Sequence, residues 1–114
     1  MAYFRALTGG SGGNSASGVL AAAQLPNDGK IITGFRPKKI MVAVYASNSN
    51  PVRADFWDYD YNPTKIIRTL YNTGQGQAKF GEADLSTSYI TSINDDGFTF
   101  YTTDVNNMMY IAVG

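Results

Sequence analysis

The sequence predicts an all-β fold, a small antiparallel β-sandwich of about six to eight strands with a flexible N-terminal arm. Short apolar runs alternate with turn residues, and none of the runs is long enough for an ordinary helix. Gly, Asn, Ser and Thr are abundant, whereas the helix formers Lys and Glu are scarce. A chain of 114 residues has room for one core. We therefore expect an arm over residues 1–18 and a single sandwich domain over residues 19–114.

The expected arm combines an apolar start with a glycine-rich tether. Thr8–Gly18 reads TGGSGGNSASG, a composition typical of flexible linkers with a root-mean-square reach of about 18 Å. Such a tether would place Tyr3, Phe4 and Leu7 on a neighbouring subunit or a scaffold, where they would anchor the domain. The alternative is that these residues form a short edge strand on their own domain.

Turn residues divide the first part of the domain into short segments. Gly18 and Pro26 confine Val19–Leu25 to a length that favours a short strand or a single turn over a helix. An Asn-Asp-Gly turn at 27–29 follows, so this segment and Lys30–Thr33 are predicted to form a hairpin.

The clearest strand in the sequence is Lys39–Ala46 (KIMVAVYA), which is rich in β-branched residues and too short for a helix. Tyr89–Ile93 and Phe98–Thr102 flank an Asn-Asp-Asp-Gly turn and predict a second hairpin. The remaining segments are expected to be extended at Val52–Tyr61, Lys65–Tyr71 and Met108–Val113, with a glycine-rich loop over Asn72–Gln77.

Two of these strands carry apolar residues on both sides. Side chains alternate along a strand, so a strand of a small sandwich should show one apolar and one polar face. Residues 39–46 and 108–113 break this rule. If Met41, Tyr45, Met108 and Tyr110 share one outer face, the patch has the size at which association is expected. We expect a homotrimer packed through these residues; the alternative is that the N-terminal segment covers this face within one chain.

Composition argues against most catalytic and nucleic-acid-binding classes. Nine Lys and Arg balance nine Asp and Glu, which gives no net field for nucleic acid or an anionic membrane. The chain has neither Cys nor His, so thiolate metal sites and the commonest general base are missing. No signal peptide and no membrane span is expected. We therefore expect a protein that is not an enzyme and has no cofactor or bound metal.

The segment around Trp57 contains the residue types that bind sugars. Trp57, Tyr59 and Tyr61 fall on one face of the predicted strand, and aromatic faces of this kind stack on sugar rings while a carboxylate such as Asp58 accepts hydroxyl protons. The alternative is that these aromatic residues pack in the core or across the oligomer interface.

The same segment also opens like a calcium-binding loop. Asp58, Asp60 and Asn62 have the D-x-D-x-N spacing. Pro63 and Thr69 stand where the full motif needs glycine and glutamate, so a metal is not expected.

Two stretches resemble known proteins. The opening MAYFRALTGGSGGN resembles those of small virion accessory proteins of tailed bacteriophages: head fibres, decoration proteins and tail or baseplate appendages. Residues 31–114 are similar in strand rhythm to H-type lectin-like domains, on the segments Gly34–Ile40, Asp96–Phe100 and Tyr110–Gly114. Those lectins contain a disulfide, which this chain without cysteine cannot form.

The resemblance implies a function, a location and partners. H-type lectin-like domains are six-stranded antiparallel sandwiches that assemble as trimers, and related modules occur on phage fibres. The resemblance therefore implies a structural or decorating protein, attached to other virion proteins of the capsid or tail and made in the cytoplasm of a bacterial host. It also implies the alternative of an adhesin module that binds carbohydrate on the host surface.

Overall fold

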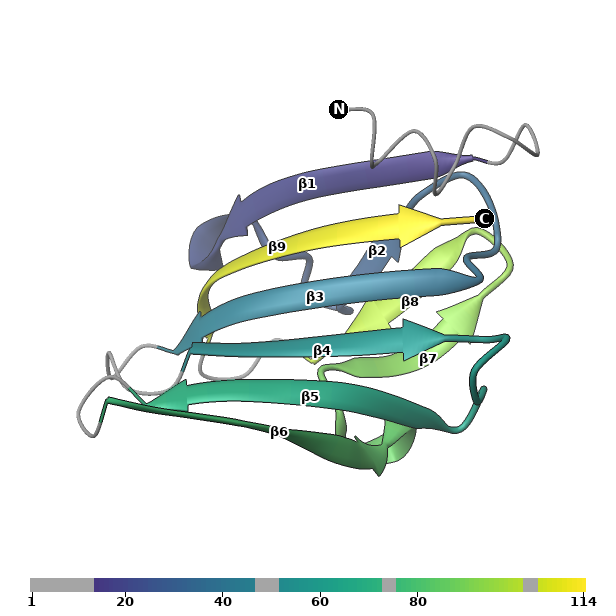
Figure 1. The fold of residues 1–114 in the computed structure, drawn as a ribbon. Helices are drawn as coiled ribbons and strands as arrows, with labels where there is room; N and C mark the ends of the chain where they lie inside the picture. Colours follow the sequence, from purple (N-terminus) through teal and green to yellow (C-terminus); the bar gives the residue numbers. More distant parts are fainter. Residues whose placement is uncertain (1–13, 47–51, 73–75, 102–104) are drawn as a thin grey trace, which may run out of the picture.

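The computed structural model describes residues 14–46, 52–72, 76–101 and 105–114 of the chain. These residues form two antiparallel sheets packed as a sandwich (Figure 1). The predicted all-β sandwich is therefore confirmed.

Nine strands and two short 3-10 turns follow one another in the described residues. Their bounds are β1 Ser15–Ala21, η1 Ala22–Gln24, β2 Lys30–Ile32, β3 Lys39–Ala46, β4 Val52–Asp58, β5 Lys65–Asn72, β6 Gln77–Asp84, η2 Leu85–Thr87, β7 Ile90–Asn94, β8 Gly97–Phe100 and β9 Val105–Val113.

The two sheets are unequal in size. The larger sheet has six strands in the order β1-β9-β3-β4-β5-β6, and the smaller has three in the order β2-β8-β7. Figure 1 shows the larger sheet in front and the smaller one behind it. We call the side of the larger sheet that contacts the smaller sheet its inner face, and the opposite side its outer face.

The hydrophobic core lies between the inner face and the smaller sheet. Along β3, Ile40, Val42 and Val44 are buried, whereas the residues between them are only half-buried. Since side chains alternate along a strand, the buried set defines the inner face. The core residues are Ile31, Ile40, Val42, Val44, Trp57, Ile66, Ile90, Phe98, Phe100, Met108 and Ala112.

Several predicted elements are present. β3 covers Lys39–Ala46 as predicted, and β7 and β8 form the second predicted hairpin. The first predicted hairpin is wrong, because β1 pairs with β9 and β2 pairs with β8. A turn does form before β2, where the N–H of Gly29 donates to the carbonyl of Pro26 over 3.0 Å. The chain then crosses to the other sheet, so the turn does not close a hairpin.

The start of the domain also differs from the prediction. Ser15–Gly18 were expected to be part of the tether but form the first half of β1, which pairs with β9 along its whole length. A strand of small residues is stable here because β9 supplies the backbone hydrogen bonds. Tyr3, Phe4 and Leu7 lie outside the described residues.

Candidate interaction face

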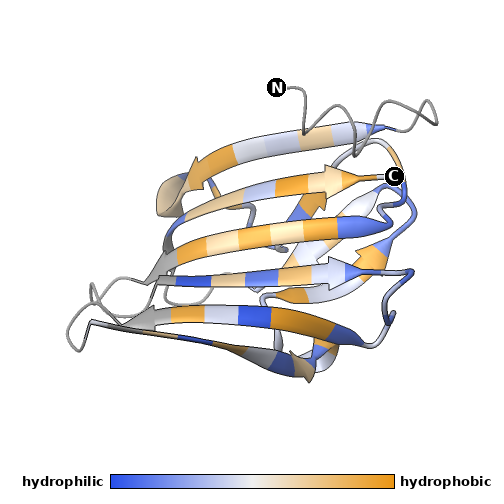
Figure 2. Ribbon diagram, in the orientation of Figure 1, coloured by the Kyte–Doolittle hydropathy of each residue, from blue (hydrophilic) through white to orange (hydrophobic). Residues whose placement is uncertain are grey.

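The outer face of the larger sheet is the candidate functional site. On β3 and β9 the side chains that alternate with the core residues are again apolar, namely Met41, Ala43, Met109 and Ile111. No described element packs on this side, since the only other sheet covers the inner face (Figure 1). Figure 2 shows β3 as a continuous apolar band after its charged first residue.

A first row of side chains, apolar except for Thr69, crosses the whole sheet. Backbone pairing places one residue from each of the six strands side by side: Val19, Met109, Ala43, Ala54, Thr69 and Phe80. Phe80 is 86% exposed, Val19 69% and Met109 47%. Large side chains with this exposure are costly to leave in water, because their transfer out of water is favourable.

A second row runs beside the first. It consists of Ser17, Ile111, Met41, Phe56, Ile67 and Glu82. Its four central residues are apolar, and Phe56 is 41% exposed. Polar residues occupy only the two ends. The apolar part of the outer face is therefore widest over the four central strands.

Ion pairs border the second row. Lys39 lies 3.4 Å from Asp58, and Lys65 pairs with Asp84. These four residues continue the outer-face positions of β3, β4, β5 and β6 by one further step along each strand. An apolar centre beside a polar rim is the arrangement found in protein interfaces.

The size of the patch can be set against known interfaces. Six strands spaced about 4.8 Å apart and two rows about 6.8 Å apart along the strands cover roughly 400 Å². The largest apolar patch of a typical monomer is about 300–600 Å² and is often functional. A partner in a standard interface buries about 800 Å², so the two rows and their rim, at roughly 500 Å², make up more than half of one such surface.

The structure corrects the residues predicted for this face. Met41 lies on it as predicted, but Met108 is 1% exposed and belongs to the core. Tyr110 also points inward, with its ring packed edge-on against Phe98 at 5.6 Å between centroids. The side chain of Tyr45 lies outside the described residues. On β9 the residues of the outer face are instead Met109 and Ile111, and only the register between β3 and β9 distinguishes the two sets.

The predicted sugar-binding aromatics are not one surface. Trp57 is 2% exposed and part of the core, and its indole N–H donates to the carbonyl of Pro63 over 2.9 Å. Tyr59 and Tyr61 are exposed. A buried indole cannot stack on a sugar ring, so the prediction for Trp57 as a sugar-binding residue is wrong.

Asp58 has a structural role in the turn after β4. Its carboxylate accepts the backbone N–H of Asp60 at 2.9 Å and pairs with Lys39. This is the local turn geometry that aspartate favours. Among the described residues no group of three or more Asp, Glu, His or Cys could hold a metal ion. The calcium-like spacing at 58–62 is thus explained by turn formation.

Tyr61 links that turn to β6. Its hydroxyl donates to the Glu82 carboxylate, and this hydrogen bond, with the negative charge of Glu82, raises the pKa of Tyr61. The hydrogen bond to Asp84 and the charge of that carboxylate likewise raise the pKa of Lys65. Both contacts lie at the polar rim of the outer face.

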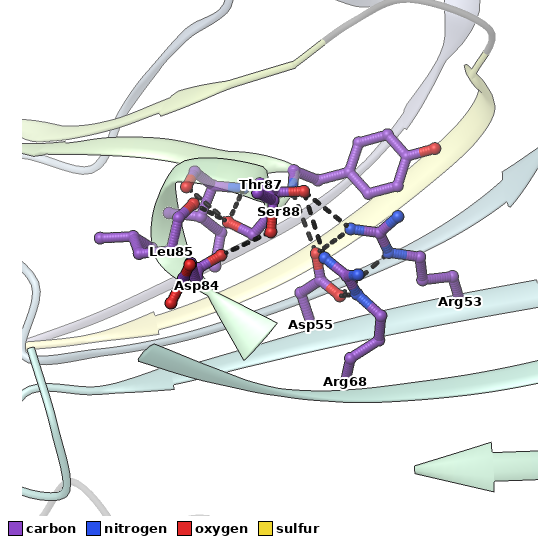
Figure 3. Close-up of polar contacts among 9 residues, drawn as sticks. Arg53, Asp55, Arg68, Asp84, Leu85, Thr87 and Ser88 are labelled. Carbon is purple, nitrogen blue, oxygen red and sulfur yellow. Dashed lines mark hydrogen bonds and ion pairs between the residues drawn. The ribbon is translucent and has the colours of Figure 1, made fainter. Parts of the chain in front are cut away.

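Asp55 is a buried carboxylate that sequence reasoning left without a role. It is fully buried on the inner face of β4. Arg53 donates to both of its oxygens, at 3.1 and 2.9 Å, and Arg68 donates to one at 3.2 Å (Figure 3). The backbone N–H of Tyr89 donates to it at 3.0 Å. The carboxylate therefore ties two strands of the larger sheet to the chain entering β7.

The same two arginines also contact the segment before β7 directly. Arg68 donates to the carbonyl of Thr87 at 3.2 Å, and the guanidinium of Arg53 lies 4.5 Å from the centre of the Tyr89 ring. Asp58 lies on the outer face and Asp55 on the inner face, so the two carboxylates do not share a cleft.

A hollow of about 380 Å³ lies where β5 begins and β6 ends. Its lining residues are Pro63, Thr64, Lys65, Asp84, Leu85, Ser86 and Thr91. Asp84 is the only carboxylate among them, and it is held by Lys65. The hollow thus lacks the pair of acidic groups that hydrolysis of a glycosidic bond needs.

Comparison of the chain with protein families, with curated proteins and with solved structures gives no match in any of the three. In the part of the chain that the structure describes, no helix is long and apolar enough to cross a membrane. We therefore infer a function from the geometry of the outer face.

Proposed function

We propose that this chain is a non-enzymatic structural or decorating protein of a bacteriophage particle, and that it assembles as a homotrimer through the outer face of its larger sheet. The observation that carries the assembly part of the proposal is the outer face, where one row of side chains reaches across six strands and the row beside it is apolar over the four central strands. A surface of this kind is expected to be covered by protein.

Two further features support a structural role. The chain has no histidine or cysteine, and its buried carboxylate Asp55 is ion-paired with two arginines that tie it into the fold. The resemblance of the first residues to phage accessory proteins suggests that the arm, with Tyr3, Phe4 and Leu7, attaches the trimer to a capsid or tail protein of the virion. On this proposal the chain is made in the host cytoplasm and incorporated into the particle.

The glycan-binding alternative has less support. It relied on Trp57 as the central stacking residue, and that indole is buried. Tyr59 and Tyr61 remain exposed, but no described cleft joins them to the buried Trp57. We therefore retain the structural role as the proposal.

The assembly is tested by the mass of the full-length chain in solution. Light scattering should give a trimer, and Met109→Asp should lower the mass because it places a charge within the first row, between Val19 and Ala43. Ile32→Asp is the matched control, because Ile32 is 61% exposed on β2 of the other sheet. A monomeric wild-type chain, or equal effects of the two substitutions, would contradict the proposal.

The virion role needs a separate test. Genes for portal, capsid or tail proteins should lie beside the gene for this chain. Deleting residues 1–13, which leaves β1 complete, should abolish its association with purified particles. Gene neighbours that encode a metabolic pathway would contradict the virion role while leaving the trimer untouched.

A further inference from the structure

The four sheet edges differ in how they are protected against pairing with another chain. An exposed edge strand offers unpaired backbone groups, and proteins protect it by short length, charge, proline or a bulge. β2 has three residues, and β7 has a register shift between Ile90 and Ser92. β6 carries Lys79, Glu82 and Asp84. Each of these three edges thus has one recognised form of protection.

The remaining edge, β1, has none of them. Its seven residues, SASGVLA, include no charge and no proline. They pair with β9 without any register shift. Figure 1 shows β1 in purple along the border of the larger sheet, and in Figure 2 most of the strand is pale or apolar. No described strand pairs with its free side.

The hydrogen bonds show which backbone groups of β1 point outward. The N–H of Gly114 donates to the carbonyl of Asn14 over 2.9 Å. In an antiparallel pair, hydrogen-bonded residues alternate with residues whose groups point to the other side. The N–H and C=O groups of Ser15, Ser17 and Val19 therefore point away from β9.

The end of β1 agrees with this alternation. The N–H of Ala21 donates to the side-chain oxygen of Gln24 over 2.8 Å, so it also points away from β9. Because this contact occupies the last outward N–H, the backbone of Ser15 through Val19 forms the open part of the edge.

We propose that this edge pairs with β1 of a second copy, antiparallel about a twofold axis through Gly18. Ser17 of each copy would then exchange N–H···O=C bonds with Val19 of the other. Both residues have outward backbone groups, so the register satisfies the alternation in both copies. The two larger sheets would continue into one another.

The side chains fit this register. Across the axis Leu20 would face Ala16, and Val19 would face Ser17, so each larger side chain lies opposite a small one. Gly18 would meet its own copy at the axis. A side chain is excluded there, since a Cβ on Gly18 would lie 2.9 Å from the ring of Tyr110. No charge is present on either strand to oppose the pairing.

This contact is separate from the proposed trimer contact. It uses the border of the larger sheet, whereas the trimer uses the side chains of its outer face. A twofold contact at β1 would therefore join two trimers and carry the apolar rows from one sheet into the next.

Amide hydrogen exchange on the full-length chain tests the proposal residue by residue. At high protein concentration the amides of Ser17 and Val19 should exchange about tenfold more slowly than after dilution, because pairing protects them. The amides of Gly18 and Leu20, which point to β9, should be protected at both concentrations and serve as the internal control.

Ser17→Pro is the matched substitution. It removes an outward N–H and leaves the bonds to β9 in place, which edge strands tolerate. The Val19 amide should then exchange fast at every concentration while those of Gly18 and Leu20 stay protected. If proline disturbs the strand, Ser17→Lys and Ser17→Glu replace it. Each variant alone should lose Val19 protection, and an equal mixture should restore it, since the two charges would lie about 7–8 Å apart on the diagonal.

Three results would overturn the proposal. Fast exchange of Ser17 and Val19 at every concentration would mean an open edge. Slow exchange at every concentration, with a mass that Ser17→Pro does not change, would assign the edge to residues 1–13 of the same chain. If the Ser17 and Val19 amides lose their protection in Met109→Asp, the protection comes from contacts of the outer face and not from pairing at β1. A Met109→Asp chain that keeps its trimer mass would contradict the proposed function and leave the edge contact intact.

Discussion

At the residue scale, burial separates side chains that look alike in the sequence. Met108 and Met109 are neighbours, yet the first belongs to the core and the second is exposed on the outer face. Trp57 and Tyr59 likewise differ, because the indole is enclosed and bonded to Pro63. Residue type predicted that these side chains were important for packing. Which of them lie on the outer face depends on strand register, which no local pattern contains.

Asp55 should be the most sensitive polar residue. Asp55→Asn removes the negative charge between Arg53 and Arg68 and should destabilise the fold by about 3 kcal/mol, the cost of breaking a buried ion pair. Urea unfolding measures it. Asp95→Asn is the control, because its pair with Arg36 is exposed and should contribute little. Equal effects would contradict the structural role of Asp55.

The rim contacts predict a loss of stability in alkali. The pKa values of Tyr61 and Lys65 are raised in the folded chain above their ordinary values of 10.0 and 10.5. Their contribution is therefore complete below about pH 10 and is lost as the pH rises through the folded values. Urea midpoints should fall between pH 9 and pH 11.5 in the wild type. The urea midpoint of Tyr61→Phe should fall less over the same pH range. A fall as large as that of the wild type would contradict the assignment of this loss to Tyr61.

At the element scale, strands with strong local signals were predictable and strands that depend on partners were not. β3 and the β7–β8 hairpin follow from β-branched runs and turn residues. β6 was missed because QAKFGEAD has a glycine near its centre and no β-branched residue. It forms as the partner of β5, over eight paired positions. The first half of β1 was missed for the same reason, because β9 supplies its backbone hydrogen bonds.

The close approach of β2 and β8 should be sensitive to a single methyl group. A Cβ on Gly97 would lie 1.9 Å from the carbonyl oxygen of Ile31. Gly97→Ala should therefore destabilise the fold by about 2–4 kcal/mol. Gly81→Ala on β6 is the control, because nothing lies within 4 Å of its Cβ position. Thermal unfolding compares the two, and equal melting temperatures would contradict the β2–β8 pairing.

At the scale of the whole molecule, the sandwich is lopsided. Three strands cover one face of six, and the other face carries the two apolar rows without any described cover. The sequence predicted this excess of apolar surface from two strands. It could not show how far the rows extend over the other strands of the larger sheet, since that requires the complete strand order.

Assembly should therefore be linked to stability. If copies bind only when folded, the melting temperature should rise with protein concentration by mass action. Scanning calorimetry between about 5 and 200 µM should show the rise for the wild type and a smaller rise for Met109→Asp. If light scattering finds the chain assembled while its melting temperature does not depend on concentration, the contact would form equally well between unfolded chains. That result would contradict the folded outer face as the interface.

The backbone ladder that holds the two rows has a kinetic consequence. Because hydrogen bonds between six strands fix the spacing of Phe56, Met109 and Phe80 before any partner arrives, docking would require almost no ordering of the main chain. Subunits of this kind arrive preorganised. Substitutions within the rows should then change how long an assembled complex lasts far more than how fast it forms.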